Sequence, residues 1–182
     1  MNAVHLLPVW MRAGACAVAV LLALPAQAAK LAAPNVVEIT PQLTTSGQPD
    51  AKALAALAAQ GYEAVVYLAP PTVPDAVADE ARIVARQGLL FVNLPIPFDA
   101  PTAAHVQSFN ALMQALAGKR VLVHCQINLR ASTMVFLHRT ITLKEDPRQA
   151  WDAVQAVWTP SGPWRTLVRE QLREHRIAFD PL

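Results

Sequence analysis

The chain has 182 residues, a formal net charge of +2 at pH 7 and 54% hydrophobic residues. A chain of this length favours a single folded domain. So small a net charge excludes nucleic acid or a charged membrane surface as the expected partner.

The first 28 residues have the layout of a secretory signal peptide. Arg12 precedes an uninterrupted apolar run over residues 13–25, and residues 26–28 form an Ala-Gln-Ala cleavage site. The run is shorter than the roughly 20 residues that a membrane-spanning helix needs. We therefore expect cleavage after Ala28, export to the bacterial periplasm and no stable membrane insertion of the product. Cleavage removes one of the two cysteines and leaves Cys125 without an intramolecular partner.

The rest of the chain alternates between strand and helix signals. Residues 29–35 are expected to form a loose leader before a domain over residues 36–182. The stretch TTSGQPD at residues 44–50 is interpreted as a turn because it contains strong breakers. β-Branched and apolar residues predict strands over residues 35–40, 63–71, 89–97 and 120–125. Apolar periodicity and capping signals predict helices over residues 51–60, 74–88, 102–118, 130–143, 147–157 and 164–175, and Asp75 or a residue near it is the expected cap of the second.

This alternation predicts an α/β fold, a three-layer sandwich with a mostly parallel central sheet flanked by helices. The helices after residue 147 precede no further strand and are expected to pack on one side. Ligands of such sheets bind beyond the carboxyl ends of the strands. The loop over residues 125–129 follows the most apolar predicted strand, so it marks the expected site.

The stretch RVLVHCQINLRAS, residues 120–132, combines a nucleophile with an anion cradle. Backbone N–H groups of a short loop between a strand and a helix can turn inward and bind an anion. The N-terminus of the following helix adds partial positive charge, and Arg130 can give two parallel hydrogen bonds to an oxyanion. The same surroundings favour the thiolate form of Cys125.

The order strand, His-Cys, short loop, Arg and hydroxyl resembles the signature loop of the cysteine-dependent protein phosphatases. The segments SGQP, VVYL, LPIPFDAPT and VLVHC extend the likeness across residues 36–177, and it looks closest to bacterial dual-specificity and tyrosine phosphatase-like families. The resemblance implies hydrolysis of a phosphomonoester without a metal or other cofactor, and a phosphorylated substrate as the partner. By the same resemblance, Cys125 attacks phosphorus, Arg130 binds the phosphoryl oxygens and an upstream Asp protonates the leaving oxygen. The residues expected to support or line the phosphate site are His124, Gln126, Ile127, Asn128, Leu129 and Ser132.

Asp99 is the candidate for that acid. It is the only acidic residue between Glu80 and Glu145, and it follows a predicted strand. General acid catalysis needs a carboxyl beside the cradle. The other interpretation is a turn or helix-cap aspartate ahead of Pro101.

The loop departs from the phosphatase pattern in length and composition. Four residues separate Cys125 from Arg130 where the pattern has five, and glycine is missing. Asn128 is the expected substitute, because asparagine tolerates the left-handed backbone region. Counted from Cys125, Ser132 stands where the family has its hydroxyl.

The short loop leaves two other hypotheses open. Rhodanese sulfurtransferases have a loop of the same length, which suits a sulfur atom carried on the cysteine. A non-catalytic module that binds an anion or a partner through this loop is the second hypothesis, favoured by the missing glycine. The large apolar side chains of Ile127 and Leu129 could crowd a dianion.

Overall fold

The computed structural model describes residues 30–182, and the signal peptide expected over residues 1–28 lies outside them. None of the helices in the described part of the chain has the length and apolar character needed to cross a membrane.

The five-stranded sheet has the order β1-β2-β5-β3-β4. β1 (Val37–Thr40) pairs antiparallel with β2 (Leu43–Ser46) at one edge. The pairs β2–β5, β5–β3 and β3–β4 are all parallel. The remaining strands are β3 (Ala64–Tyr67), β4 (Leu90–Asn93) and β5 (Val121–His124). The mostly parallel sheet is confirmed, but β2 occupies part of the stretch interpreted as a turn, and that interpretation is wrong for residues 44–46.

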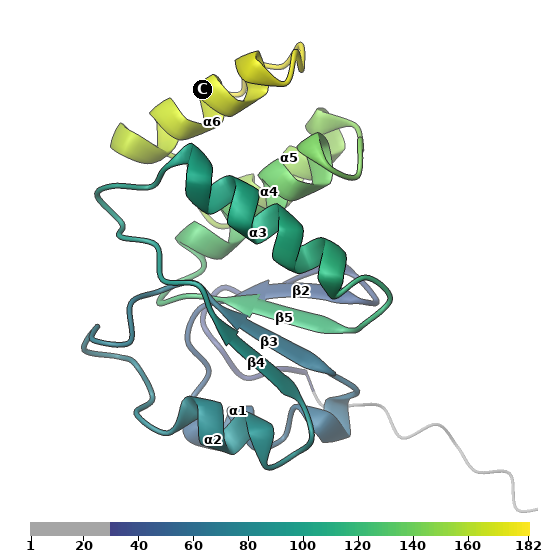
Figure 1. The fold of residues 1–182 in the computed structure, drawn as a ribbon, viewed down its shortest axis with the longest axis vertical. Coiled ribbons are helices and arrows are strands. Elements are labelled where there is room, and N and C mark those ends of the chain that lie inside the picture. The colour runs from purple at the N-terminus through teal and green to yellow at the C-terminus, as the bar shows by residue number, and fades with distance from the viewer. Residues whose placement is uncertain (1–29) are drawn as a thin grey trace, which may run out of the picture.

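Helices cover both faces of the sheet, which confirms the three layers (Figure 1). On one face lie α1 (Ala51–Leu54) and α2 (Glu80–Ala85), with a 3₁₀ turn over Ala58–Gln60. On the other face lie α3 (Ala103–Ala115), α4 (Leu129–Ile141), α5 (Pro147–Gln155) and α6 (Gly162–Glu174). α4 is almost entirely buried, because it lies between the sheet and the last two helices. The apolar core on this face fixes the start of α4 against the end of β5.

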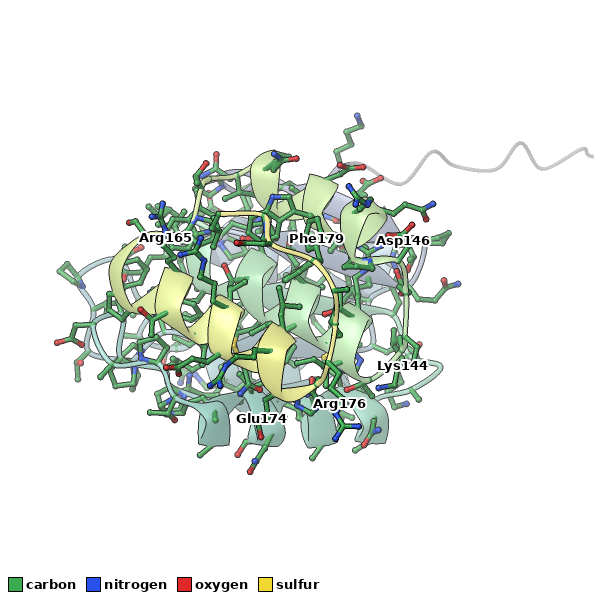
Figure 2. All side chains as sticks on the ribbon, turned by 90° about the horizontal axis from the view of Figure 1, so that it is seen from above. Lys144, Asp146, Arg165, Glu174, Arg176 and Phe179 are labelled. Carbon is green, nitrogen blue, oxygen red and sulfur yellow. The ribbon has the colours of Figure 1, made fainter. Side chains whose placement is uncertain are left out.

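The C-terminal helices pack on one side, as expected. Seen from above, the chain turns back at Arg176 after α6 and brings Phe179 over the helices below (Figure 2). The Phe179 ring lies 6.3 Å from the Phe136 ring of α4 and 6.2 Å from the Trp151 ring of α5. These aromatic contacts hold the outer helices on α4, the helix that follows the cysteine loop.

The loop between β3 and α2 is longer than predicted. A helix was expected over residues 74–88, but α2 begins only at Glu80. Pro71 and Pro74 restrict the backbone just ahead of it and favour turns. Asp75 therefore lies in a loop at the carboxyl edge of the sheet and does not cap a helix.

The segment before β1 is packed against the domain, so the prediction of a loose leader is wrong for residues 31–35. Leu31 is buried in the apolar cluster beneath α1 and α2. The carbonyl of Pro34 accepts a hydrogen bond from Gly47 N at 2.7 Å. The Asn35 side chain donates to the carbonyl of Ile127 at 2.9 Å. Leu31 and Pro34 attach the segment to the α1–α2 cluster and to the end of β2, and Asn35 attaches it to the cysteine loop.

Candidate active site

Cys125 stands directly after β5, at the carboxyl ends of three parallel strands. Its N–H donates to the carbonyl of Ser46 at the end of β2, at 3.2 Å. On the other side, the carbonyl of His124 accepts from Leu68 N at the end of β3, at 2.9 Å. Cys125 carries a free thiol and is 1% exposed. The sheet therefore holds the backbone at Cys125 from both sides.

The missing glycine of the loop is replaced by Asn128, as predicted. Asn128 has φ 74° and ψ 2°, and it directly precedes the first residue of α4. Its Nδ2 group donates to the carbonyl of Asn35 at 2.6 Å and to Thr45 Oγ1 at 3.1 Å. The buried side chain thus contacts β2 and the N-terminal segment. Its side chain shapes the loop through these hydrogen bonds, and a role of Asn128 in binding phosphate stays a prediction.

Gly47 allows β2 to end against the cysteine loop. A β-carbon on Gly47 would lie 2.8 Å from the carbonyl oxygen of Gln126 and 3.1 Å from the α-carbon of Ile127. The adjacent Gln48 N–H donates to that Gln126 carbonyl at 2.9 Å. The third contact of the new methyl group would be with Pro34 Cβ at 2.9 Å. Since the other two contacts involve loop backbone, the loop itself would have to move.

Replacing Gly47 by alanine is therefore expected to destabilise the fold by about 1–3 kcal/mol, the usual cost of overpacking. Turnover is expected to fall by more than the loss of folded protein explains, because the displaced backbone carries the cysteine. Urea denaturation and steady-state kinetics measure the two effects. Gly118→Ala is the control for loss of a glycine without crowding. Nothing lies within 4 Å of its β-carbon position, although its φ of 83° is itself unfavourable for alanine. Equal turnover of Gly47→Ala and wild type would contradict the close approach.

The cysteine opens into a cavity of about 210 Å³. Its lining consists of Asp75, Phe98, Cys125, Gln126, Ile127, Leu129 and Arg130. A larger hollow of about 440 Å³ lies at the opposite ends of the strands, where Leu43 and Val121 are among its lining residues. Volume alone therefore does not identify the site. Gln126, Ile127 and Leu129, the loop residues expected at the phosphate site, line the cavity with Cys125.

Arg130 reaches the cysteine cavity in spite of the shortened spacing. Its Nε donates to the carbonyl of Ile96 at 2.9 Å, and its Nη1 donates to Gln126 Oε1 at 3.2 Å. The guanidinium carbon lies 5.1 Å from the centre of the Phe98 ring. Arg130 is 5% exposed, so these contacts position its charge in a largely water-free place. The second N–H of Nη1 and both N–H groups of Nη2 remain for an oxyanion.

His124 braces the loop from behind and does not line the cavity. Its Nε2 lies 2.6 Å from Glu80 Oε1, and both side chains are buried. This is a close contact and not an aligned hydrogen bond, since neither atom has a hydrogen-bond partner. The other carboxylate oxygen, Glu80 Oε2, accepts from Gln48 Nε2 at 2.9 Å. The His124 ring also stacks on Tyr67, with ring centres 4.8 Å apart.

Charges in this brace and in the cavity lining both act on the pKa of Tyr67. Burial raises the pKa of Tyr67 to about 12, helped by the negative charges of Glu80, Asp75 and Cys125, while Arg130 acts in the opposite direction. Glu80, Gln48, Tyr67 and Asp75 were not predicted as site residues. Their signal in the sequence is position alone, because each stands at or just beyond the carboxyl end of a strand or at the helix that follows.

Ser132 uses its hydroxyl inside α4. The hydroxyl lies 2.8 Å from the carbonyl of Asn128 and 3.2 Å from that of Leu129, and it donates to these helix carbonyls. Ser132 is buried and does not line the cavity. In this structure its hydroxyl stabilises the first turn of α4, and stabilisation of a departing thiolate stays a prediction.

Asp99 does not line the cysteine cavity in this structure. It is exposed and lines a separate hollow together with Thr102 and Glu170, between the starts of α3 and α6. The preceding Phe98 is held in place, because its carbonyl accepts from Trp164 Nε1 at 2.8 Å. The carboxylate that lines the cysteine cavity is Asp75.

The comparisons with known proteins agree with this geometry. Residues 34–167 match the family model described as DSP-PTPase phosphatase fused to NAD+ kinase. The beta-lactamase hydrolase-like protein of Xylella fastidiosa strain Temecula1 is 30% identical over 160 residues, which covers 81% of this chain and 35% of that protein. The chain thus spans about a third of the length of the curated relatives that it matches.

Two solved structures have the same fold. One, from Shewanella putrefaciens, carries the name of a DUF442 phosphatase. It is 28% identical, has a TM-score of 0.71 and covers 79% of this chain and 94% of its own. The other is TpbA of P. aeruginosa, 21% identical with a TM-score of 0.61, covering 80% of this chain and 90% of its own. The predicted phosphatase-like architecture is therefore confirmed.

Proposed function

The chain belongs to the DSP-PTPase phosphatase family, and on this premise we propose that it hydrolyses a phosphomonoester through a phosphocysteine intermediate on Cys125. One observation carries the proposal. Cys125 and Arg130 line one cavity, although the loop between them is a residue shorter than the phosphatase pattern. A nucleophile beside an oriented guanidinium is the pair of groups that phosphoryl transfer requires.

The reaction begins with attack of the Cys125 thiolate on phosphorus. Arg130 binds two phosphoryl oxygens with its remaining N–H groups, and the backbone N–H groups of the loop add further donors. The leaving oxygen takes a proton from a carboxylic acid as its bond to phosphorus breaks. Water then displaces the Cys125 sulfur and releases phosphate. The resemblance offers Asp99 as the acid, but Asp99 lies outside the cavity here.

An aryl phosphate is the first substrate class to test. A solved structure of a TpbA variant holds pTyr, and the apolar lining by Phe98, Ile127 and Leu129 suits an aromatic leaving group. Purified protein in the presence of a chelator is expected to release phosphate from phosphotyrosine and from p-nitrophenyl phosphate. A protein that transfers sulfur from thiosulfate to cyanide and releases no phosphate would instead be the sulfurtransferase that the short loop also suits.

We also propose that the protein is exported, on the strength of the signal-peptide pattern over residues 1–28. Expression of the full chain in a bacterium is expected to give a periplasmic product that begins at Ala29. Terminal sequencing checks this, and a product that retains residues 1–28 would contradict it.

A further inference from the structure

A second carboxylate lies at the cysteine cavity, on a loop that the proposed mechanism has not used. Asp75 belongs to the proline-rich segment between β3 and α2 and lines the cavity together with Cys125 and Arg130. Its side chain is exposed, so it can exchange protons with water. These are the two properties that a general acid needs: a place beside the reacting atoms and access to solvent protons.

Gln126 ties Asp75 to the arginine. Its Nε2 donates to Asp75 Oδ1 at 2.7 Å, and its Oε1 accepts from Arg130 Nη1 at 3.2 Å. Charge fixes this orientation of the amide, because the reverse would turn its NH₂ group toward the guanidinium and its oxygen toward the carboxylate. A single side chain therefore bridges the carboxylate and the phosphate-binding group across the cavity.

The pKa of Tyr67 is consistent with this grouping of charges. Burial raises the pKa of Tyr67, and the charges of Asp75 and Cys125 add to this rise while Arg130 opposes it. Asp99 has no such influence on Tyr67 and lines a hollow with residues of α3 and α6. The two candidate acids thus differ in which cavity each one faces.

We propose that Asp75 is the general acid and base of this site, an inference that rests on the proposed phosphatase function. In the first step the Cys125 sulfur forms a bond to phosphorus, the bond from phosphorus to the leaving oxygen breaks, and that oxygen takes the proton from Asp75 Oδ2. In the second step Asp75 takes a proton from water as the water oxygen attacks phosphorus, and the sulfur–phosphorus bond breaks. The thiolate and the protonated carboxyl are thereby restored.

The test is the dependence of turnover on the leaving group. Asp75→Asn is expected to lower kcat/KM for phenyl phosphate by roughly 10²-fold or more, the usual contribution of a general acid. The same variant should lose less than about 10-fold on 2,4-dinitrophenyl phosphate, whose phenolate leaves without a proton. A residue that only helped to bind the phosphate would lower both values alike.

Two further variants make the result decisive. Asp79→Asn is the matched control, because Asp79 is exposed on the same loop and pairs with Arg82; it should behave as wild type. Asp99→Asn tests the rival acid and should retain the wild-type dependence on the leaving group. A leaving-group-dependent loss in Asp99→Asn and none in Asp75→Asn overturns the inference. Turnover that is absent, or that survives Cys125→Ser, rejects the phosphatase function itself.

Discussion

Replacing Cys125 by serine is expected to lower kcat for an aryl phosphate by at least about 10⁴-fold, as loss of an essential nucleophile does elsewhere. A serine hydroxyl stays protonated at neutral pH and needs a base to become nucleophilic. The neighbouring imidazole of His124 is directed at the buried carboxylate of Glu80, so it is not placed to act as that base. The variant therefore keeps the cavity and loses the reacting atom.

The affinity of Cys125→Ser for inorganic phosphate shows whether the variant has lost only the reaction or also the binding site. Arg130 and the loop backbone remain in Cys125→Ser, so inorganic phosphate should bind with an affinity close to that of wild type. Calorimetry of phosphate binding, together with thermal unfolding, checks that the fold and cradle persist. Turnover within tenfold of wild type would contradict a cysteine mechanism.

Replacing Arg130 by lysine is expected to lower kcat/KM by roughly 10²–10³-fold, in the range found when a transition-state oxyanion loses a donor. Lysine keeps the charge but loses the planar pair of donors that matches two phosphoryl oxygens. It also lacks the rigid fork through which Arg130 binds Ile96 and Gln126. We expect kcat to fall along with phosphate affinity, because these hydrogen bonds strengthen in the transition state.

Arg86→Lys is the matched control for Arg130→Lys. Arg86 is exposed at the end of α2, away from the cavity lining, so its replacement should leave kinetics and stability unchanged. Steady-state kinetics on phosphotyrosine compare the two variants. If Arg130→Lys kept kcat/KM within fivefold of wild type, the assignment of Arg130 as the phosphoryl ligand would be rejected.

The central sheet was largely predictable from the sequence, and its missing strand has a physical explanation. β3 and β5 are apolar and fully buried, which is the pattern expected of central parallel strands. β2 is equally buried but carries Thr44, Thr45 and Ser46 ahead of Gly47. Tyr62 and Asn128 donate to the hydroxyls of Thr44 and Thr45, and these partners come from distant parts of the chain. Local composition could not reveal that these polar residues are satisfied within a sheet.

The site was predictable where it depends on local backbone geometry and not where it depends on tertiary contacts. The positive φ of Asn128 was predictable, because the loop needs a residue in the left-handed region and contains no glycine. Asp75 looked like a helix cap, and its link to the site passes through Gln126, 51 residues away. Glu80 was not singled out as a site residue in the sequence, yet it is buried against His124. Neither contact has a signature in the spacing of the sequence.

The shortened loop still brings Cys125 and Arg130 to one cavity. A cysteine and an arginine separated by four residues could have pointed to different places. The left-handed residue Asn128 and the contacts of Arg130 with Ile96 and Phe98 bring the guanidinium to the thiol's cavity. The shortening is thus compatible with an anion site built from the same two groups as a full-length loop.

Trapping the covalent intermediate tests the central claim most directly. The protein is mixed with 2,4-dinitrophenyl phosphate, quenched in acid during turnover and digested, and the Cys125 peptide is measured by mass spectrometry. We predict one phosphoryl group on Cys125 in the wild-type protein and none in Cys125→Ser. A Cys125 peptide that never carries a phosphoryl group while phosphate is released, and that gains a sulfur atom when the protein is mixed with thiosulfate instead, would contradict the account.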